Sequence, residues 1–63
     1  MKESVYDCSG PDGRANVLPL ADGRWAVYHW QRMRLYVEGV FSDVEDAKKW
    51  ARAVTGCKHG NDT

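Results

Sequence analysis

Arginines alternate with aromatic side chains in the middle of this sequence, over residues 24–36. Guanidinium groups bind phosphates and guanine edges, whereas aromatic rings stack on bases and sugars. A surface that carries both residue types therefore suits a nucleic acid. The residues of this predicted surface are Arg24, Tyr28, Trp30, Arg32, Arg34 and Tyr36.

The same aromatic residues also have a purely structural interpretation. Tyr28, Trp30 and Tyr36 are the residue types of a cross-strand aromatic ladder, over which arginines can stack. A domain of 63 residues buries only about 60% of its unfolded surface, so it depends on such packing. The sequence leaves both interpretations open.

Two cysteines and two histidines are the other residues that could do chemistry. Cys8, His29, Cys57 and His59 are ligands that zinc accepts, but their spacing matches no common zinc motif. We expect His29 to be a half-buried strand residue that is hydrogen-bonded to the backbone. Because the sequence shows neither a nucleophile motif nor a glycine-rich phosphate loop, we expect no enzymatic activity and no cofactor.

Alternation and turn signals predict the strands that position these residues. Asp22-Gly23 is typical of a tight hairpin turn. Pro19 cannot donate to a ladder, so its strand is expected to lie at an edge or to carry a bulge, and strand 24–30 is expected in the centre. Residues 4–9 either add a further edge strand or stay irregular. The three strands of the predicted sheet span residues 16–21, 24–30 and 34–41.

A helix is predicted over residues 43–55. Ser42 and Glu45 have the spacing of a capping box at its start, and Gly56 is placed to end it in a left-handed cap. Residues 57–63 are polar, and we expect them to form a frayed tail.

These elements predict one α+β domain, residues 1–63, in which a three-stranded antiparallel sheet packs on a C-terminal helix. The helix should cover one sheet face and leave the face with the arginines and aromatic residues open. The predicted core consists of Trp25, Val27, Leu35, Val37, Phe41, Val44, Ala47, Trp50, Ala51 and Val54.

The charge of the chain is balanced overall but segregated along the sequence. Nine basic and nine acidic residues give no net charge, which argues against a general polyanion binder. Residues 14–36, however, contain four arginines against the single acid Asp22, and residues 38–46 contain four acids and no base. The predicted sheet is therefore basic, and the acids suit the start of the helix.

The sequence indicates a cytoplasmic protein without a membrane partner. No segment is apolar over the length of a membrane span, and the first six residues lack the apolar stretch of a signal peptide. In that compartment Cys8 and Cys57 are expected to be free thiols, with a bridge between them as the alternative.

Three segments resemble a known family. Gly23-Arg24-Trp25, the basic strand 32–36 and residues 39–47 resemble the arm-type DNA-binding domain of tyrosine recombinases, and the plant ethylene-response-factor domain is similar. The resemblance covers about half of the chain. It implies a three-stranded sheet on one helix, with the free sheet face in a major groove. The groove-reading residues would be Arg24, Tyr28, Trp30, Arg34 and Tyr36.

This sequence departs from that pattern in two respects: Glu38 lies on the expected groove face, and the net charge is zero. Residues 36–47 equally resemble half of a peptidoglycan-binding sporulation-related repeat.

A second function fits the same residues. Trp, Tyr and Arg are enriched at the centres of protein interfaces. The chain is therefore either a DNA-binding module or a protein-interaction module, such as an accessory or inhibitor protein of a phage or plasmid. It would act as a monomer or a homodimer, and salt dependence of binding separates DNA from a protein partner.

Overall fold

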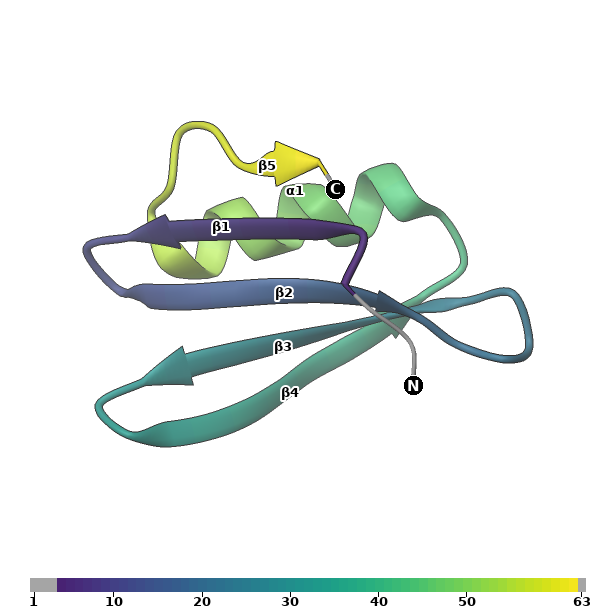
Figure 1. Cartoon of the computed structure of the whole chain (residues 1–63), viewed down its shortest axis with the longest axis horizontal. Helices are drawn as coiled ribbons and strands as arrows, with labels where there is room; N and C mark the ends of the chain where they lie inside the picture. Colours follow the sequence, from purple (N-terminus) through teal and green to yellow (C-terminus); the bar gives the residue numbers. More distant parts are fainter. Residues whose placement is uncertain (1–3, 63) are drawn as a thin grey trace.

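A five-stranded antiparallel sheet carries one helix on one of its faces (Figure 1). The structure is a computed structural model that describes residues 4–62. It confirms the α+β class with an antiparallel sheet and one C-terminal helix, but the expectation of three strands is wrong. The elements are β1 (Tyr6–Gly10), β2 (Gly13–Pro19), β3 (Trp25–Gln31), β4 (Arg34–Phe41), α1 (Val44–Thr55) and β5 (Asn61–Asp62).

The strand order is β4-β3-β2-β1-β5, so β2 is central where we expected strand 24–30. The N-terminal segment pairs with β2 along its whole length, from Tyr6 opposite Val17 to Gly10 opposite Gly13. Pro19 is tolerated because it is the last residue of β2, where a missing N–H interrupts no ladder. The strand we left undecided is therefore an interior member of the sheet.

The C-terminal segment, which we expected to be frayed, returns to the sheet beside β1 (Figure 1). Asp62 lies opposite Tyr6, and its Oδ1 is 2.6 Å from Lys48 Nζ on the helix. Gly60 has no room for a side chain, because a Cβ there would overlap the Tyr6 ring. A glycine and an ion pair thus hold β5 in place.

The helix begins one residue later than the capping box predicts. Asp43, not Ser42, is the N-cap, and its Oδ1 accepts a hydrogen bond from the Glu45 N–H at 2.8 Å. Both residue types are good N-caps, so the sequence pattern does not separate them. At the other end Gly56, with φ of 72°, forms the left-handed cap as predicted and donates to the Arg52 carbonyl.

A β-bulge in β4 changes which side chains face the helix. Val27 pairs with Gly39, but the next residue of β3, Tyr28, pairs with Val37, so Glu38 is an extra residue. Because side chains alternate along a strand, one extra residue moves all later side chains to the other face.

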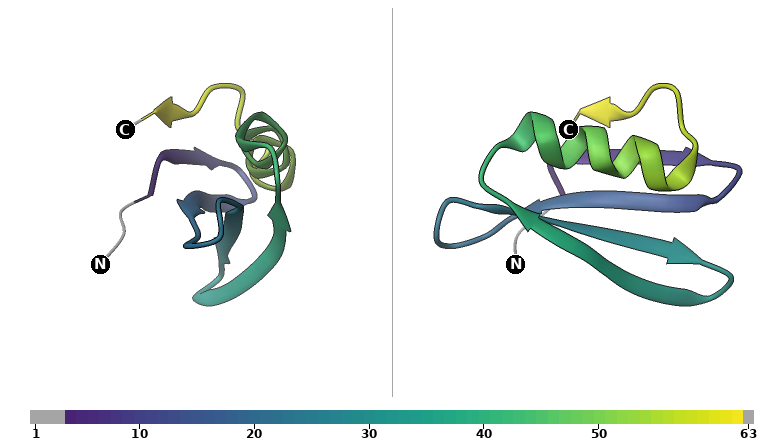
Figure 2. Two further views of the ribbon diagram at one scale, coloured as in Figure 1. Left: turned by 90° about the vertical axis from the view of Figure 1, so that its right-hand side faces the viewer. Right: turned by 180° about the vertical axis from the view of Figure 1, so that it is seen from behind.

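The core is centred on β1, β2 and β3 rather than on β3 and β4. Val27, Ala47 and Ala51 are fully buried as predicted. The remaining buried apolar residues are Tyr6, Cys8, Ala15, Val17 and Ala26. Of the four long strands, β2 and β3 have the most contacts with the helix and β4 has the fewest, and the β3–β4 hairpin extends away from the helix (Figure 2).

Three of the predicted core residues are exposed. Leu35 and Val37, which follow the bulge on the way to the turn, are 47% and 64% exposed. Trp50 is 45% exposed. Its ring packs against the Phe41 ring at a centroid distance of 6.0 Å and does not enter the core. The remaining four residues of that prediction are half-buried: Trp25, Phe41 and Val54 pack against the core, and Val44 lies at the start of the helix.

The described burial predicts that the same substitution, valine to threonine, lowers stability at one position of the sheet and leaves it almost unchanged at another. Val17→Thr places a hydroxyl in the fully buried centre of the sheet and should lower the free energy of unfolding by about 1–3 kcal/mol. Val37→Thr keeps a β-branched residue on an exposed strand and should change it by less than about 0.5 kcal/mol. Urea denaturation of both variants measures the difference, and equal losses would contradict the described register.

Candidate interaction surface

The sheet face that points away from the helix is formed by three cross-strand rows of side chains. The register places Arg14 beside Trp30 and Leu35, Asn16 beside Tyr28 and Val37, and Leu18 beside Ala26 and Val40. We call these nine residues the open face. Each row takes one residue from each of β2, β3 and β4, so the face is built on regular, mutually paired strands.

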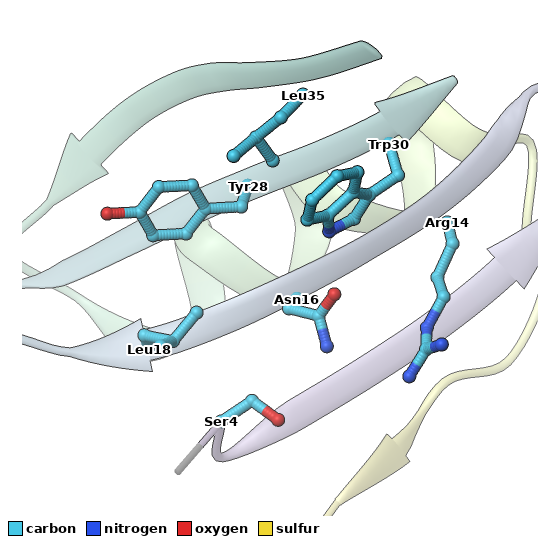
Figure 3. A pocket seen from close by; sticks show the side chains of 7 residues that line it. All are labelled: Ser4, Arg14, Asn16, Leu18, Tyr28, Trp30 and Leu35. Carbon is cyan, nitrogen blue, oxygen red and sulfur yellow. The ribbon is translucent and has the colours of Figure 1, made fainter. Parts of the chain in front are cut away.

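Most of the open face is apolar and accessible to solvent. Trp30, Leu35, Val37 and Val40 are each exposed by 45% or more. Between the side chains lies a shallow hollow of about 500 Å³ (Figure 3). It is lined by Ser4, Arg14, Asn16, Leu18, Tyr28, Trp30 and Leu35. Monomeric soluble proteins rarely leave large contiguous apolar patches exposed, so such a patch indicates a binding surface.

The polar residues at the margin of the hollow differ in their bonds to other residues of the chain. Asn16 Nδ2 donates to Asp7 Oδ1, and Ser4 Oγ donates to the same oxygen at 3.1 Å. Arg14, in contrast, is exposed and takes part in none of the ion pairs within residues 4–62. Its guanidinium is therefore available to an acidic group of a ligand.

The structure separates the six residues that the sequence analysis grouped together. Tyr28 and Trp30 lie on the open face. Tyr36 lies on the other side of β4, where its ring is 6.0 Å from that of His29. Arg34, two residues before Tyr36, shares that side, and Arg32 is in the β3–β4 turn with φ of 50°. The bulge at Glu38 causes this separation.

Arg24 stands apart from the other arginines, in the β2–β3 hairpin. Its guanidinium is 2.6 Å from Asp22 Oδ2 and also hydrogen-bonds to it through Nε. The hydrogen bonds from Arg24 hold the pKa of the Asp22 carboxyl below its usual range. Since both side chains are exposed, this pair balances the local charge without anchoring the fold.

A second hollow, of about 650 Å³, lies at the end of the β3–β4 hairpin. Gln31, Arg32, Arg34 and Tyr36 line it. Three of the predicted site residues thus remain together here, although away from Tyr28 and Trp30.

The predicted surface left out seven of the nine residues of the open face, which are Arg14, Asn16, Leu18, Ala26, Leu35, Val37 and Val40. Alternation within 13–19 was a usable signal for the first three, since the buried Ala15 and Val17 lie between them. For Leu35 and Val37 the only signal was Gly39, because a glycine inside a strand often marks a bulge.

His29 is buried and links the bulge to the β1–β2 turn. It is 6% exposed, and its Nε2 lies 2.9 Å from the Asp12 carbonyl oxygen. A carbonyl oxygen only accepts, so Nε2–H donates this hydrogen bond. Nδ1 lies 3.3 Å from Glu38 Oε2. The expectation of a strand histidine that is hydrogen-bonded to the backbone is confirmed, but the residue is buried and not half-buried.

The remaining candidate ligands do not form a metal site. Cys8 is buried against Thr55 Oγ1 at 3.6 Å, and burial raises the pKa of its thiol. Cys57 is a half-buried thiol whose Sγ donates to the His59 carbonyl. Within residues 4–62, no three His, Cys, Asp or Glu side chains are grouped so that they could hold a metal ion.

Comparison with known proteins gives no relative: no family model, no curated protein and no solved structure is significantly similar to this chain. Among the described residues, no helix is both long and apolar enough to cross a bilayer.

The hydrogen bond of His29 to the Asp12 carbonyl and its contact with Glu38 predict its contribution to stability. His29→Leu leaves the Asp12 carbonyl and Glu38 without this partner, so the free energy of unfolding should fall by about 1–3 kcal/mol. His59→Leu, at an exposed position, is the matched control and should have little effect. Thermal and urea unfolding measure both; an unchanged midpoint for His29→Leu would show that these bonds do not support the fold.

Proposed function

We propose that this chain is a small protein-interaction module that binds its partner through the open face. The observation that carries the proposal is the contiguous apolar surface of Tyr28, Trp30, Leu35, Val37 and Val40 on one side of the sheet. Its chemistry is that of an interface centre, where aromatic residues dominate and charges are few.

The open face also indicates the chemistry of the partner. The hollow offers an apolar floor beside Tyr28, Trp30 and Leu35, which suits an inserted apolar side chain (Figure 3). Arg14 at its margin suits a neighbouring carboxylate. The expected partner segment is therefore an apolar anchor next to an acidic residue.

Peptides selected from a random display library against the purified chain test this proposal. We expect enriched peptides with an apolar anchor beside Asp or Glu, because these groups match the hollow and Arg14. Leu35→Glu should weaken their binding at least tenfold, as measured by fluorescence anisotropy, because it puts a charge into the apolar row.

Met33→Glu is the matched control, since it adds the same charge in the turn, where Met33 is fully exposed and off the open face. Its affinity should equal that of the parent. Equal affinities for Leu35→Glu and Met33→Glu, or selected peptides that lack an apolar anchor, would exclude the open face as the binding surface.

DNA binding is the second candidate, and a different observation favours it. Arg14, Arg32 and Arg34 lie towards the same end of the sheet, near the pairs Arg14–Trp30 and Gln31–Arg34. None of the three takes part in an ion pair with another described residue. Arginines that are not neutralised by an acidic partner attract phosphates.

A chemical-shift titration with duplex DNA at low salt tests this second candidate. If DNA is the ligand, amides of the β3–β4 turn should shift, and the affinity should fall steeply as salt is raised. Arg32→Ala combined with Arg34→Ala should abolish the shifts. Arg24→Ala is the control and should preserve them, because Arg24 is already paired with Asp22. A spectrum that DNA leaves unchanged at low salt removes this candidate.

A further inference from the structure

β4 is a long strand at the edge of the sheet. It has eight residues without proline, and no described strand pairs with its outer side. Its side chains from Arg34 to Val37 are exposed. The opposite edge, β5, has only two residues. An edge like β4 presents a row of unpaired N–H and C=O groups to another strand.

The β3–β4 turn determines which backbone groups of β4 face outward. Arg32 and Met33, with φ of 50° and 65°, form a two-residue turn of the hairpin type between Gln31 and Arg34. In a β-turn the first carbonyl accepts from the fourth N–H, so Gln31 and Arg34 are a hydrogen-bonded pair.

Hydrogen-bonded and non-hydrogen-bonded pairs alternate along an antiparallel ladder. The pair of His29 and Tyr36 is therefore hydrogen-bonded, whereas Leu35 and Val37 belong to the non-bonded pairs. It follows that the N–H and C=O groups of Leu35 and Val37 point to the free edge.

These outward groups form a self-complementary segment. In an antiparallel pairing about a two-fold axis at Tyr36, Leu35 lies opposite Val37 of the second copy, and Arg34 lies opposite its Glu38. An axis at Leu35 would instead place Arg34 against Tyr36. An axis at Val37 would place Arg34 against Val40. Among pairings of β4 residues, only the axis at Tyr36 brings opposite charges together and uses both outward-facing residues.

The side chains that meet in this pairing also lie on matching sides. Glu38 is on the helix side, where its carboxylate contacts His29 Nδ1 at 3.3 Å and Trp50 Nε1 at 3.2 Å. Arg34 and Tyr36 share that side. Leu35 and Val37 are on the open face, so the two open faces would join across the axis.

We propose that two copies of this chain associate through β4, antiparallel and centred on Tyr36, to form one continuous sheet. The proposal goes beyond the proposed function, because it uses the edge of the sheet and not the hollow. A short strand pairing buries less area than the roughly 1,200–2,000 Å² of a standard interface, so the dimer should dissociate readily.

Sedimentation velocity from about 10 µM to about 1 mM should show a monomer–dimer equilibrium. Amide hydrogen exchange locates the interface over the same range. Protection of the Leu35 and Val37 amides should rise with concentration, while that of Tyr36 should not change. A monomer at the highest concentration, or protection that is independent of concentration at all three amides, would overturn the proposal.

Two substitutions test whether the dimer forms through the β4 edge or through another surface. Val37→Pro removes an outward N–H and should raise the dimer dissociation constant at least tenfold, whereas Val37→Thr keeps the N–H and should preserve the dimer. Arg34→Glu opposes Glu38 of the second copy and should weaken the dimer several-fold. Arg32→Glu makes the same charge change in the turn and should have a smaller effect.

The circular dichroism spectrum of each variant shows whether it is folded. If Val37→Pro does not fold, Arg34→Glu and Arg32→Glu still decide the outcome. A dimer that tolerates both Arg34→Glu and Val37→Pro would contradict the β4 pairing. Because Arg34 lies on the other side of β4 from the open face, selected peptides should still bind the Arg34→Glu monomer, so loss of the dimer and loss of the proposed function are distinguishable.

Discussion

The anchoring of Glu38 is the interaction on which the rest of the structure depends. Its carboxylate accepts a hydrogen bond from Trp50 Nε1 on the helix and lies 3.3 Å from Nδ1 of the buried His29. Both contacts place the Glu38 side chain on the helix side of the sheet. The next residue, Gly39, pairs with Val27 and is directed to the same side, so two successive residues share one side. The strand accommodates two such neighbours only by bulging.

The bulge divides β4 into two parts that pack differently. In the C-terminal part, next to the helix, Phe41 packs on Trp50 and contributes to the core. Beyond the bulge, Leu35 and Val37 leave the core and extend the apolar face that Tyr28 and Trp30 begin. The core is completed by β1 and β2 instead, which is why the helix lies over those strands and the β3–β4 hairpin projects from the body (Figure 2).

Local signals in the sequence were sufficient for the helix and three of the five strands, but not for which side chains face the helix. Turn residues, alternation and the glycine cap at Gly56 located the helix and three strands, and the position of His29 on the core side was correct. Two long-range contacts were not readable. The pairing of β5 with β1 depends on a close approach at Gly60, and the bulge depends on bonds from Glu38 to residues 9 and 12 positions away. Because the bulge reverses side-chain direction, the predicted surface mixed residues of both faces.

The central claim is that the bulge at Glu38 places Leu35 and Val37 on the face away from the helix. Nuclear Overhauser contacts of their methyl groups in solution test it most directly. The structure predicts contacts from Leu35 to the Trp30 indole and from Val37 to the Tyr28 ring, together with contacts between the rings of Tyr36 and His29. Contacts from Leu35 or Val37 to the methyl groups of Ala47 or Ala51 in the helix would contradict it.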